Sequence, residues 1–198
     1  MSVPQYQELI DNDTTDMLAV ALAIQDIEDL NKAQISNNYH TLLTYAVYME
    51  NECVVSFLLQ KGASINARSQ WGRSPLHFAC TLDMAKLLIN LGADVNAEDD
   101  DGETPIVPIM YSECNDKPTW LRYMIENGAN VNHVDNVGYT PLHRAIDAQD
   151  VVSVKILLDA EADVNTKSQL GHTPRKAAAR NEAIQDLLED CDEKGKED

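Results

Sequence analysis

The stretch "GYTPLHRAIDAQDVVSVKILLDAEADVN", residues 138–165, decides the fold of this chain. Thr140 is a residue type that caps helix N-termini, and Pro141 suits the first helical position, where no hydrogen-bond donor is lost. An apolar face follows at the helical spacing i, i+3, i+4, formed by Leu142, Ala145 and Ile146. A second apolar face is formed by Val151, Val154, Ile156, Leu157 and Leu158. The stretch therefore predicts two short helices in succession.

Two phrases of this stretch return along the chain at a nearly constant period. The first phrase begins at Gly72, Gly102, Gly138 and Gly171, as "GRSPLHFA", "GETPIVPI", "GYTPLHRA" and "GHTPRKAA". The spacings between these glycines are 30, 36 and 33 residues. The second phrase reads "KGASINA", "LGADVNA", "NGANVNH" and "AEADVNT", beginning at residues 61, 91, 127 and 160. Self-similarity at a fixed period of this length predicts a repeat architecture.

The period of about 33 residues and the two phrases resemble those of ankyrin repeats. "YTPLHRA" matches the family signature almost fully, and "RSPLHFA" matches it with Ser74 in place of threonine. The resemblance covers about residues 40–190. It implies an all-α fold, an ankyrin-repeat solenoid of stacked helix pairs joined by β-turn or hairpin loops.

The resemblance divides the chain into four parts. We expect an N-terminal arm at residues 1–15, a helical N-terminal cap at 16–38, an ankyrin-repeat domain at 39–190 and a charged, disordered tail at 191–198. The repeats begin near residues 39, 72, 102, 138 and 171. The first repeat is degenerate, and the last carries Arg175 and Lys176 in place of Leu-His, as suits a C-terminal cap that faces water.

Three irregularities give local predictions. The unit at Gly72 lacks three residues between its helices, so the first helix must shorten or the loop must vanish. The unit at Gly102 carries three extra residues, around residues 111–118. Glu161 stands where other units have a helix-ending glycine, and a left-handed backbone there would cost about 1 kcal/mol.

The charge and apolar patterning limit the classes of partner. The chain carries 15 Lys and Arg against 33 Asp and Glu, a net charge of -18. This argues against direct binding of nucleic acid and favours a basic protein partner. The longest apolar run, residues 17–24, is too short to span a bilayer, and the N-terminus shows no signal peptide. The four cysteines form no CxxC pair, so we expect neither a zinc site nor a disulfide framework, and a cytoplasmic or nuclear location.

No pattern in the sequence indicates catalysis. His77 and His143 occupy the same place in the first phrase two periods apart, which puts them about 20 Å apart and excludes a shared metal. The resemblance implies that this histidine hydrogen-bonds the backbone. The run "EDDDGE" at residues 98–103 lacks the ligand spacing of a calcium loop and is interpreted as a solvated turn. GxSxG, P-loop, HExxH and dinucleotide motifs are absent, so we expect no catalytic, cofactor-binding or metal-ligating residues.

The resemblance also implies where a partner protein binds, namely against the turn tips and the first helices. Large aromatic residues, arginine and acidic residues at these places are the predicted partner-binding residues: Tyr45, Tyr48, Trp71, Arg73, Phe78, Asp99, Asp100, Asp101, Tyr111, Tyr139 and Arg144. Alternatives remain for three of them, since Trp71 can pack on the neighbouring tip, and Tyr45 and Phe78 can lie partly in the core. Trp120 is expected in the core. An acidic tip beside an aromatic one would suit a partner with a basic segment and an apolar anchor.

We therefore expect a non-catalytic protein-protein interaction module that is monomeric before it enters a complex. Small ankyrin proteins are often regulatory subunits or inhibitors, so a protein kinase or cell-cycle complex is the first candidate partner. The ankyrin family of kinase inhibitors also has an abbreviated first helix in its second repeat, which the unit at Gly72 resembles. The alternatives are a substrate adaptor, for example for a ubiquitin ligase, and a protein that masks a basic segment of a transcription factor.

Overall fold

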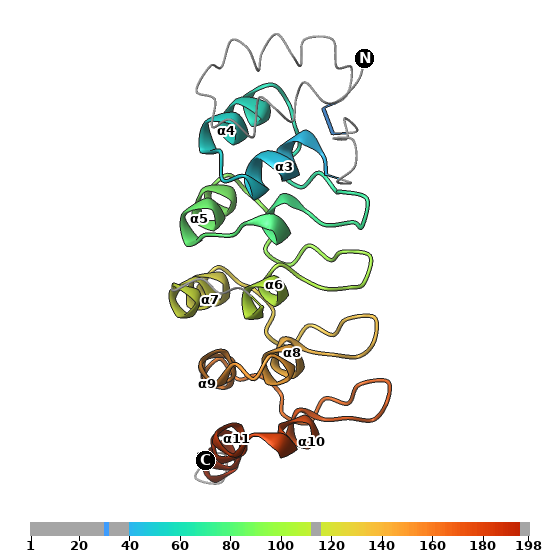
Figure 1. Cartoon of the computed structure of the whole chain (residues 1–198), viewed down its shortest axis with the longest axis vertical. Coiled ribbons are helices and arrows are strands. Elements are labelled where there is room, and N and C mark those ends of the chain that lie inside the picture. Colours follow the sequence, from blue (N-terminus) through green and yellow to red (C-terminus); the bar gives the residue numbers. More distant parts are fainter. Residues whose placement is uncertain (1–29, 32–39, 112–115, 195–198) are drawn as a thin grey trace. The chain divides into compact units, whose positions relative to one another are not determined.

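The computed structural model describes residues 30–31, 40–111 and 116–194 (Figure 1). These residues form short helices joined by turns, and no strand occurs among them. They fall into two compact units, residues 1–100 and 101–198. The predicted N-terminal arm, and all of the predicted cap except residues 30–31, lie outside the described residues.

The first unit contains two helix pairs. Its elements are α3 (Leu42–Tyr48), α4 (Glu52–Gln60), the 3-10 turn η1 (Pro75–Phe78) and α5 (Leu82–Asn90). The first helix α3 packs against its own partner α4 and against η1 of the next repeat. Apolar side chains between these elements form the core, among them Leu42, Leu43, Val54, Leu58, Leu76, Met84 and Leu88.

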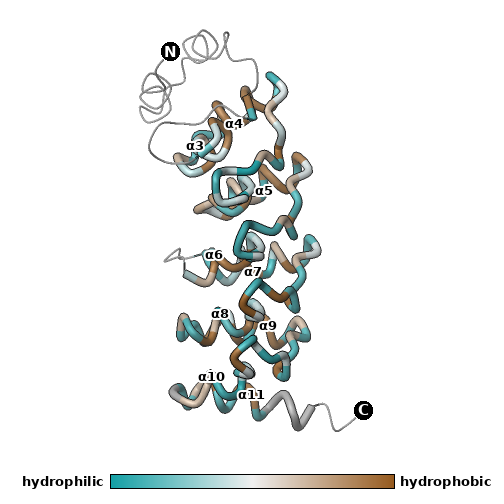
Figure 2. The backbone as a smooth tube through the Cα atoms, turned by 90° about the vertical axis from the view of Figure 1, so that its right-hand side faces the viewer, coloured by the Kyte–Doolittle hydropathy of each residue, from teal (hydrophilic) through white to brown (hydrophobic). Residues whose placement is uncertain are grey.

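The second unit repeats this arrangement three times. Its elements are α6 (Ile106–Met110), α7 (Lys117–Glu126), α8 (Pro141–Asp147), α9 (Val151–Asp159), α10 (Pro174–Ala177), η2 (Ala178–Arg180) and α11 (Glu182–Lys194). The first helix α8 contacts α6 and α10, and the second helix α9 contacts α7 and α11. Within this unit first and second helices thus form two adjacent rows, with the turn tips projecting beyond the first helices (Figure 1). Polar and apolar stretches alternate along the tube of each pair (Figure 2), as expected for helices with one buried face.

Side-chain caps start α3, α8, α9 and α10, whereas α6 and α7 begin without a side-chain cap. Thr140 Oγ1 accepts a hydrogen bond from His143 N, and Thr41 and Thr173 cap α3 and α10 in the same way. The second helix α9 is capped by Asp150, whose side chain accepts from Ser153 N. Each cap of this kind stabilises its helix by about 1 kcal/mol.

The unit at Gly72, which is three residues shorter than the standard repeat, has a shortened first helix, one of the two predicted outcomes. The turn η1 spans four residues, whereas the equivalent helix α8 spans seven. The chain becomes extended at Ala79, and Thr81 then caps α5 through a hydrogen bond from Met84 N. Both helix starts are therefore kept, and the loss falls on the last turn of the first helix.

Among the described residues other than glycine, left-handed backbone occurs at one predicted residue and at two that the sequence does not mark. Glu161 has φ 62°, as expected for a residue in a helix-ending glycine position. Glu50 and Gln149 also have positive φ, 57° and 56°, at the join between the two helices of their repeats. They lie 99 residues apart, three repeat periods, so this join recurs in register with residues other than glycine.

The C-terminal helix α11 has one buried face and one exposed polar face, as expected for the last helix of a repeat array. The inner face of α11 buries Ile184 and Leu188, while Glu182, Asp186 and Glu189 are exposed. Residues 191–194, which the sequence assigns to the disordered tail, belong instead to α11, which continues to Lys194. Residues 189–194 contain neither glycine nor proline, and Gly195 is the first residue after α11 that strongly disfavours a helix. Residues 195–198 lie outside the described residues.

Candidate functional site

The histidine of the first phrase is structural in both repeats that carry it. His77 Nδ1 accepts a hydrogen bond from Ser74 N, and His143 Nδ1 accepts one from Thr140 N, each at 3.1 Å. The Nε2 atom of His143 lies 3.1 Å from the carbonyl oxygen of His172 in the next repeat and is thus the protonated nitrogen. Burial lowers the pKa of His143, so the ring is neutral near pH 7. No group of three potential metal ligands occurs among the described residues.

Four aromatic rings gather on the first helices of the first unit. His40 lies against Phe78 with 4.4 Å between ring centroids, and it stacks on Tyr48 at 5.8 Å and meets Tyr45 at 5.9 Å. Tyr45 is only 4 % exposed, which corrects its assignment as a partner contact, because the neighbouring rings enclose it. Tyr48 is 52 % exposed and Phe78 is half-buried. Of the predicted residues in this cluster, Tyr48 thus offers the most surface to a partner.

The turn tip of the second repeat presents an exposed tryptophan beside a closed ion pair. Trp71 is 48 % exposed, and its carbonyl oxygen accepts a hydrogen bond from Asp100 N at 3.0 Å. The Asp99 carboxylate is buried and accepts a hydrogen bond from Arg73 Nε at 3.0 Å. Asp99 is therefore not a surface acidic group, which corrects its predicted role. Asp100 and Asp101 are exposed, as expected for a turn tip.

An arginine of the second unit is held in place by two carboxylates. The guanidinium of Arg144 forms ion pairs with Glu103 and Asp135 and lies 5.0 Å from the centroid of the Tyr139 ring. The Asp135 carboxylate also accepts a hydrogen bond from Tyr139 N at 2.7 Å. Tyr111 is 56 % exposed, and burial of the remainder raises the pKa of its hydroxyl, an effect that the nearby Arg144 opposes. Arg144 thus connects the Tyr139 ring to the carboxylates of Glu103 and Asp135.

Residues that the sequence reasoning missed line a hollow between α8 and α10. His172, Lys176 and Ala177 contribute to it from the last repeat, opposite Tyr139 and His143. The cationic pair Arg175-Lys176 is assigned to a C-terminal cap by the repeat pattern alone. Its departure from the Leu-His pattern was the signal that could have indicated a distinct surface.

The repeated helix pairs, with capped first helices and linked turn tips, define an ankyrin-repeat protein. A family model described as ankyrin repeats (3 copies) matches residues 9–99, 82–168 and 109–197, and the chain belongs to this family. The predicted fold class is therefore confirmed. Trp120, 2 % exposed, is in the core as predicted.

The family match begins earlier than the resemblance in the sequence indicated, at residue 9 instead of about residue 40. The side-chain oxygen of Asn31 accepts a hydrogen bond from Ser64 N at 2.6 Å. Asn66 accepts from Asp94 N, and Asn132 from Asp163 N, at the same place of the second phrase. Asn31 thus makes the hydrogen bond that the asparagine of the second phrase makes in other repeats, although the sequence around Asn31 does not match that phrase. For this reason the sequence alone predicts a cap in this segment.

Similar proteins are much longer than this chain. The tyrosine-protein kinase HTK16 of Hydra vulgaris is 33% identical over 150 residues, which cover 72% of this chain and 19% of that protein. The tyrosine-protein kinase Shark of Drosophila melanogaster is 31% identical over 180 residues, 86% of this chain and 19% of Shark. The ankyrin repeat protein OPG189 of Variola virus is 31% identical over 131 residues, 61% of this chain and 23% of OPG189. This chain thus spans about a fifth of the length of these relatives.

Ankyrin repeats make this chain a protein-protein interaction module. No described helix combines the length and apolar character that crossing a lipid bilayer requires.

Proposed function

We propose that this protein is a non-catalytic regulatory subunit or inhibitor that acts by occupying a partner protein. The observation that carries the proposal is a set of exposed aromatic side chains on the first helices and turn tips: Tyr48, Trp71 and Tyr111. Tyr48 and Trp71 lie in the first unit and Tyr111 in the second, and exposed aromatic residues are the typical anchors of protein interfaces. No cofactor is needed for this function.

The first candidate partner is a protein kinase or a cell-cycle complex. Support comes from the shortened first helix η1, which resembles the abbreviated helix of kinase-inhibiting ankyrin proteins. Two relatives are named tyrosine-protein kinases, although the match covers about a fifth of each. We propose a cytoplasmic or nuclear protein, monomeric before complex formation, with no direct contact to nucleic acid or membrane.

Affinity capture with mass spectrometry tests this function. The comparison is between the wild-type protein and a triple variant, Tyr48→Ala, Trp71→Ala and Tyr111→Ala. Because the three side chains are 48 to 56 % exposed, their removal leaves the core intact, and loss of a partner reports on the surface. We expect the main partners to disappear from the triple variant while thermal unfolding changes little.

A matched control removes apolar surface from second helices instead. Leu91 follows α5 and Val152 lies in α9, and they are 48 % and 52 % exposed. The double variant Leu91→Ala, Val152→Ala should retain every partner. Retention of all partners by the folded triple variant would refute the proposed surface. Recovery of ubiquitin-ligase subunits or a transcription factor in place of a kinase would favour the adaptor or masking function.

A further inference from the structure

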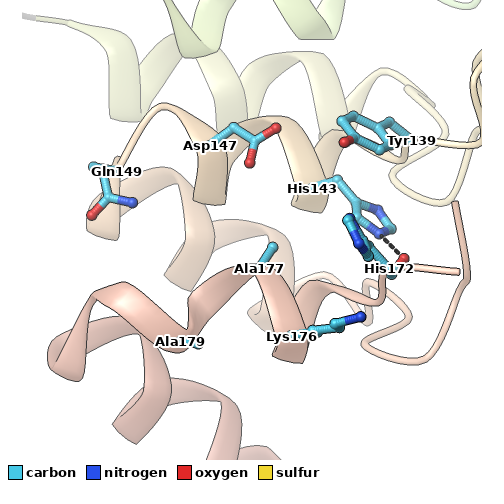
Figure 3. Close-up of a pocket in the computed structure, with 8 residues that line it drawn as sticks. All are labelled: Tyr139, His143, Asp147, Gln149, His172, Lys176, Ala177 and Ala179. Atoms are coloured by element: carbon cyan, nitrogen blue, oxygen red, sulfur yellow. Dashed lines mark hydrogen bonds between the residues drawn. The ribbon is translucent and has the colours of Figure 1, made fainter. Parts of the chain in front are cut away.

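A hollow of about 320 Å³ opens between α8 and the first helix of the last repeat (Figure 3). We name it the α8–α10 hollow. Tyr139 and His143 line it on the α8 side, and His172, Lys176, Ala177 and Ala179 line it on the other. Ala177 and Ala179 lie one 33-residue period after Arg144 and Ile146, so two small side chains replace two large ones. The hollow is a direct consequence of the alanine-rich first helix of the last repeat.

Hydrogen bonds across the hollow hold its two sides together. The rings of Tyr139 and His143 stack with 5.1 Å between centroids and 7° between planes. His143 Nε2 then reaches the carbonyl oxygen of His172 in the last repeat at 3.1 Å (Figure 3). At the other end, Asn181 Nδ2 donates to Gln149 Oε1 at 2.9 Å. A cavity fixed in this way needs little ordering when it is filled, which favours binding.

A stretch that covers the turn tip and the first helix of the last repeat is basic, although α11 of the same repeat and the chain as a whole are acidic. Residues 164–181 contain four of the 15 Lys and Arg and none of the 33 Asp and Glu. Lys176 lies at the hollow and is exposed. Its ammonium group and the ring of His172 form no hydrogen bond or ion pair with described residues. On the α8 side the hollow carries one carboxylate, that of Asp147 (Figure 3).

We propose that the α8–α10 hollow is the docking site for an acidic segment of a partner protein. A carboxylate of the segment pairs with Lys176, and an apolar side chain beside it fills the space over Ala177 against the ring of Tyr139. Charge complementarity favours this occupant on the α10 side, because Lys176 lies in a stretch, residues 164–181, that carries four Lys and Arg and no carboxylate. Asp147 on the α8 side repels a second carboxylate, so the segment's acidic group is placed at Lys176. A nucleic acid strand would extend beyond it onto acidic repeats, where its phosphates are repelled. The inference rests on the proposed function, because it names the chemical class of a partner segment that the proposed interaction module binds.

Nuclear magnetic resonance of the full chain labelled with ¹⁵N tests the proposal. The probe is the acetylated peptide Glu-Glu-Leu-Glu-Glu, and the matched control peptide has lysine in place of glutamate. We expect the acidic peptide to shift the amide signals of residues 172–179 and of Tyr139, and the lysine peptide to leave them unchanged. Lys176→Glu should weaken the peptide about tenfold, because it replaces an attraction by a repulsion.

Two further variants distinguish binding of the peptide in the hollow from attraction of the peptide by the overall charge of the protein. Lys155→Glu makes the same charge change on the exposed surface of α9, outside the hollow, and should leave the affinity nearly unchanged. Ala177→Leu fills the hollow without changing charge and should weaken the peptide severalfold, with folding checked by thermal unfolding.

The proposal is overturned by equal shifts from both peptides or by equal weakening in Lys155→Glu and Lys176→Glu. Tighter binding of an oligouridylate of equal charge would also overturn it, in favour of nucleic acid. These failures are distinguishable from failure of the proposed function. Capture of partners through Tyr48, Trp71 and Tyr111 does not depend on the hollow.

Discussion

At the scale of the residue, burial separates the predicted partner-binding residues into two kinds. Tyr48, Trp71 and Tyr111 are about half exposed, whereas Tyr45 and the Asp99 carboxylate are buried. The repeat pattern assigns a position in the helix or turn, and this much could be predicted. It could not predict burial, because burial depends on neighbours that the pattern does not fix, such as His40 beside Tyr45.

Glu161 offers a prediction at this scale. Its φ of 62° is strained for a residue with a Cβ atom and is natural for glycine. We expect Glu161→Gly to raise the free energy of unfolding by about 1 kcal/mol. Urea denaturation at pH 7 measures the change. The control Glu161→Gln removes the same charge and keeps the strain, so an equal gain in this variant would attribute the effect to charge.

At the scale of the element, one lysine ties three helices of the second unit together. Lys117 Nζ donates to the carbonyl oxygen of Met110, which ends α6, and to Asp150 Oδ2, which caps α9, at 3.1 and 2.9 Å. The Lys117 and Asp150 side chains are 19 % and 14 % exposed. We expect Lys117→Met to lower the free energy of unfolding by about 2 kcal/mol, since the carboxylate loses its cation while largely buried. Urea denaturation measures the loss. A matched control is Lys86→Met on the exposed side of α5, which should change stability little.

The same ion pair gives a pH dependence with a definite sign. Burial raises the pKa of Asp150, but hydrogen bonds from Lys117 and Ser153 outweigh it, and the net shift is downward. The Asp150 carboxylate therefore contributes its full stabilisation to the free energy of unfolding above the pKa that it has in the unfolded chain, near pH 4. This stabilisation is lost as the pH falls through the lower pKa that the carboxylate has in the folded protein. Asp150→Asn keeps an N-cap oxygen and removes the charge.

We expect Asp150→Asn to be less stable than wild type at pH 7, and the difference to shrink below about pH 4. Urea denaturation at a series of pH values gives both curves. A difference that stays constant down to pH 2 would show that the carboxylate charge is not what stabilises this junction.

The elements also show which parts of the fold could be predicted from the sequence. The threonine cap of α8 was predictable, because the capping residue lies next to the helix that it starts. The phrase spacing limited the unit at Gly72 to two outcomes, of which the structure has the shortened first helix. The left-handed joints at Glu50 and Gln149 were not, because neither carries the glycine or asparagine that usually marks this conformation. The contact from Asn31 to Ser64 was not predictable for a related reason, since the hydrogen bond of the second phrase recurs here without the sequence letters of that phrase.

At the scale of the whole molecule, the decisive property is an excess of negative charge spread along the repeats. A net charge of -18 on 198 residues leaves many carboxylates without a cation, because Lys and Arg number 15 against 33 Asp and Glu. Like charges repel in the folded state more than in the expanded unfolded chain, so they lower stability. Salt screens this repulsion over a Debye length of about 10 Å at 0.1 M.

We therefore expect the midpoint of thermal unfolding to rise by a few degrees between 10 mM and 300 mM sodium chloride. Circular dichroism measures the midpoint, and potassium chloride is the control that separates screening from binding of a particular cation. The competing effect is the weakening of ion pairs such as that of Arg73 with Asp99, but those carboxylates are largely buried and are screened less than exposed charges. A midpoint that falls with salt would mean that the ion pairs outweigh the repulsion. The excess of carboxylates would then act on partners without lowering the stability of the fold.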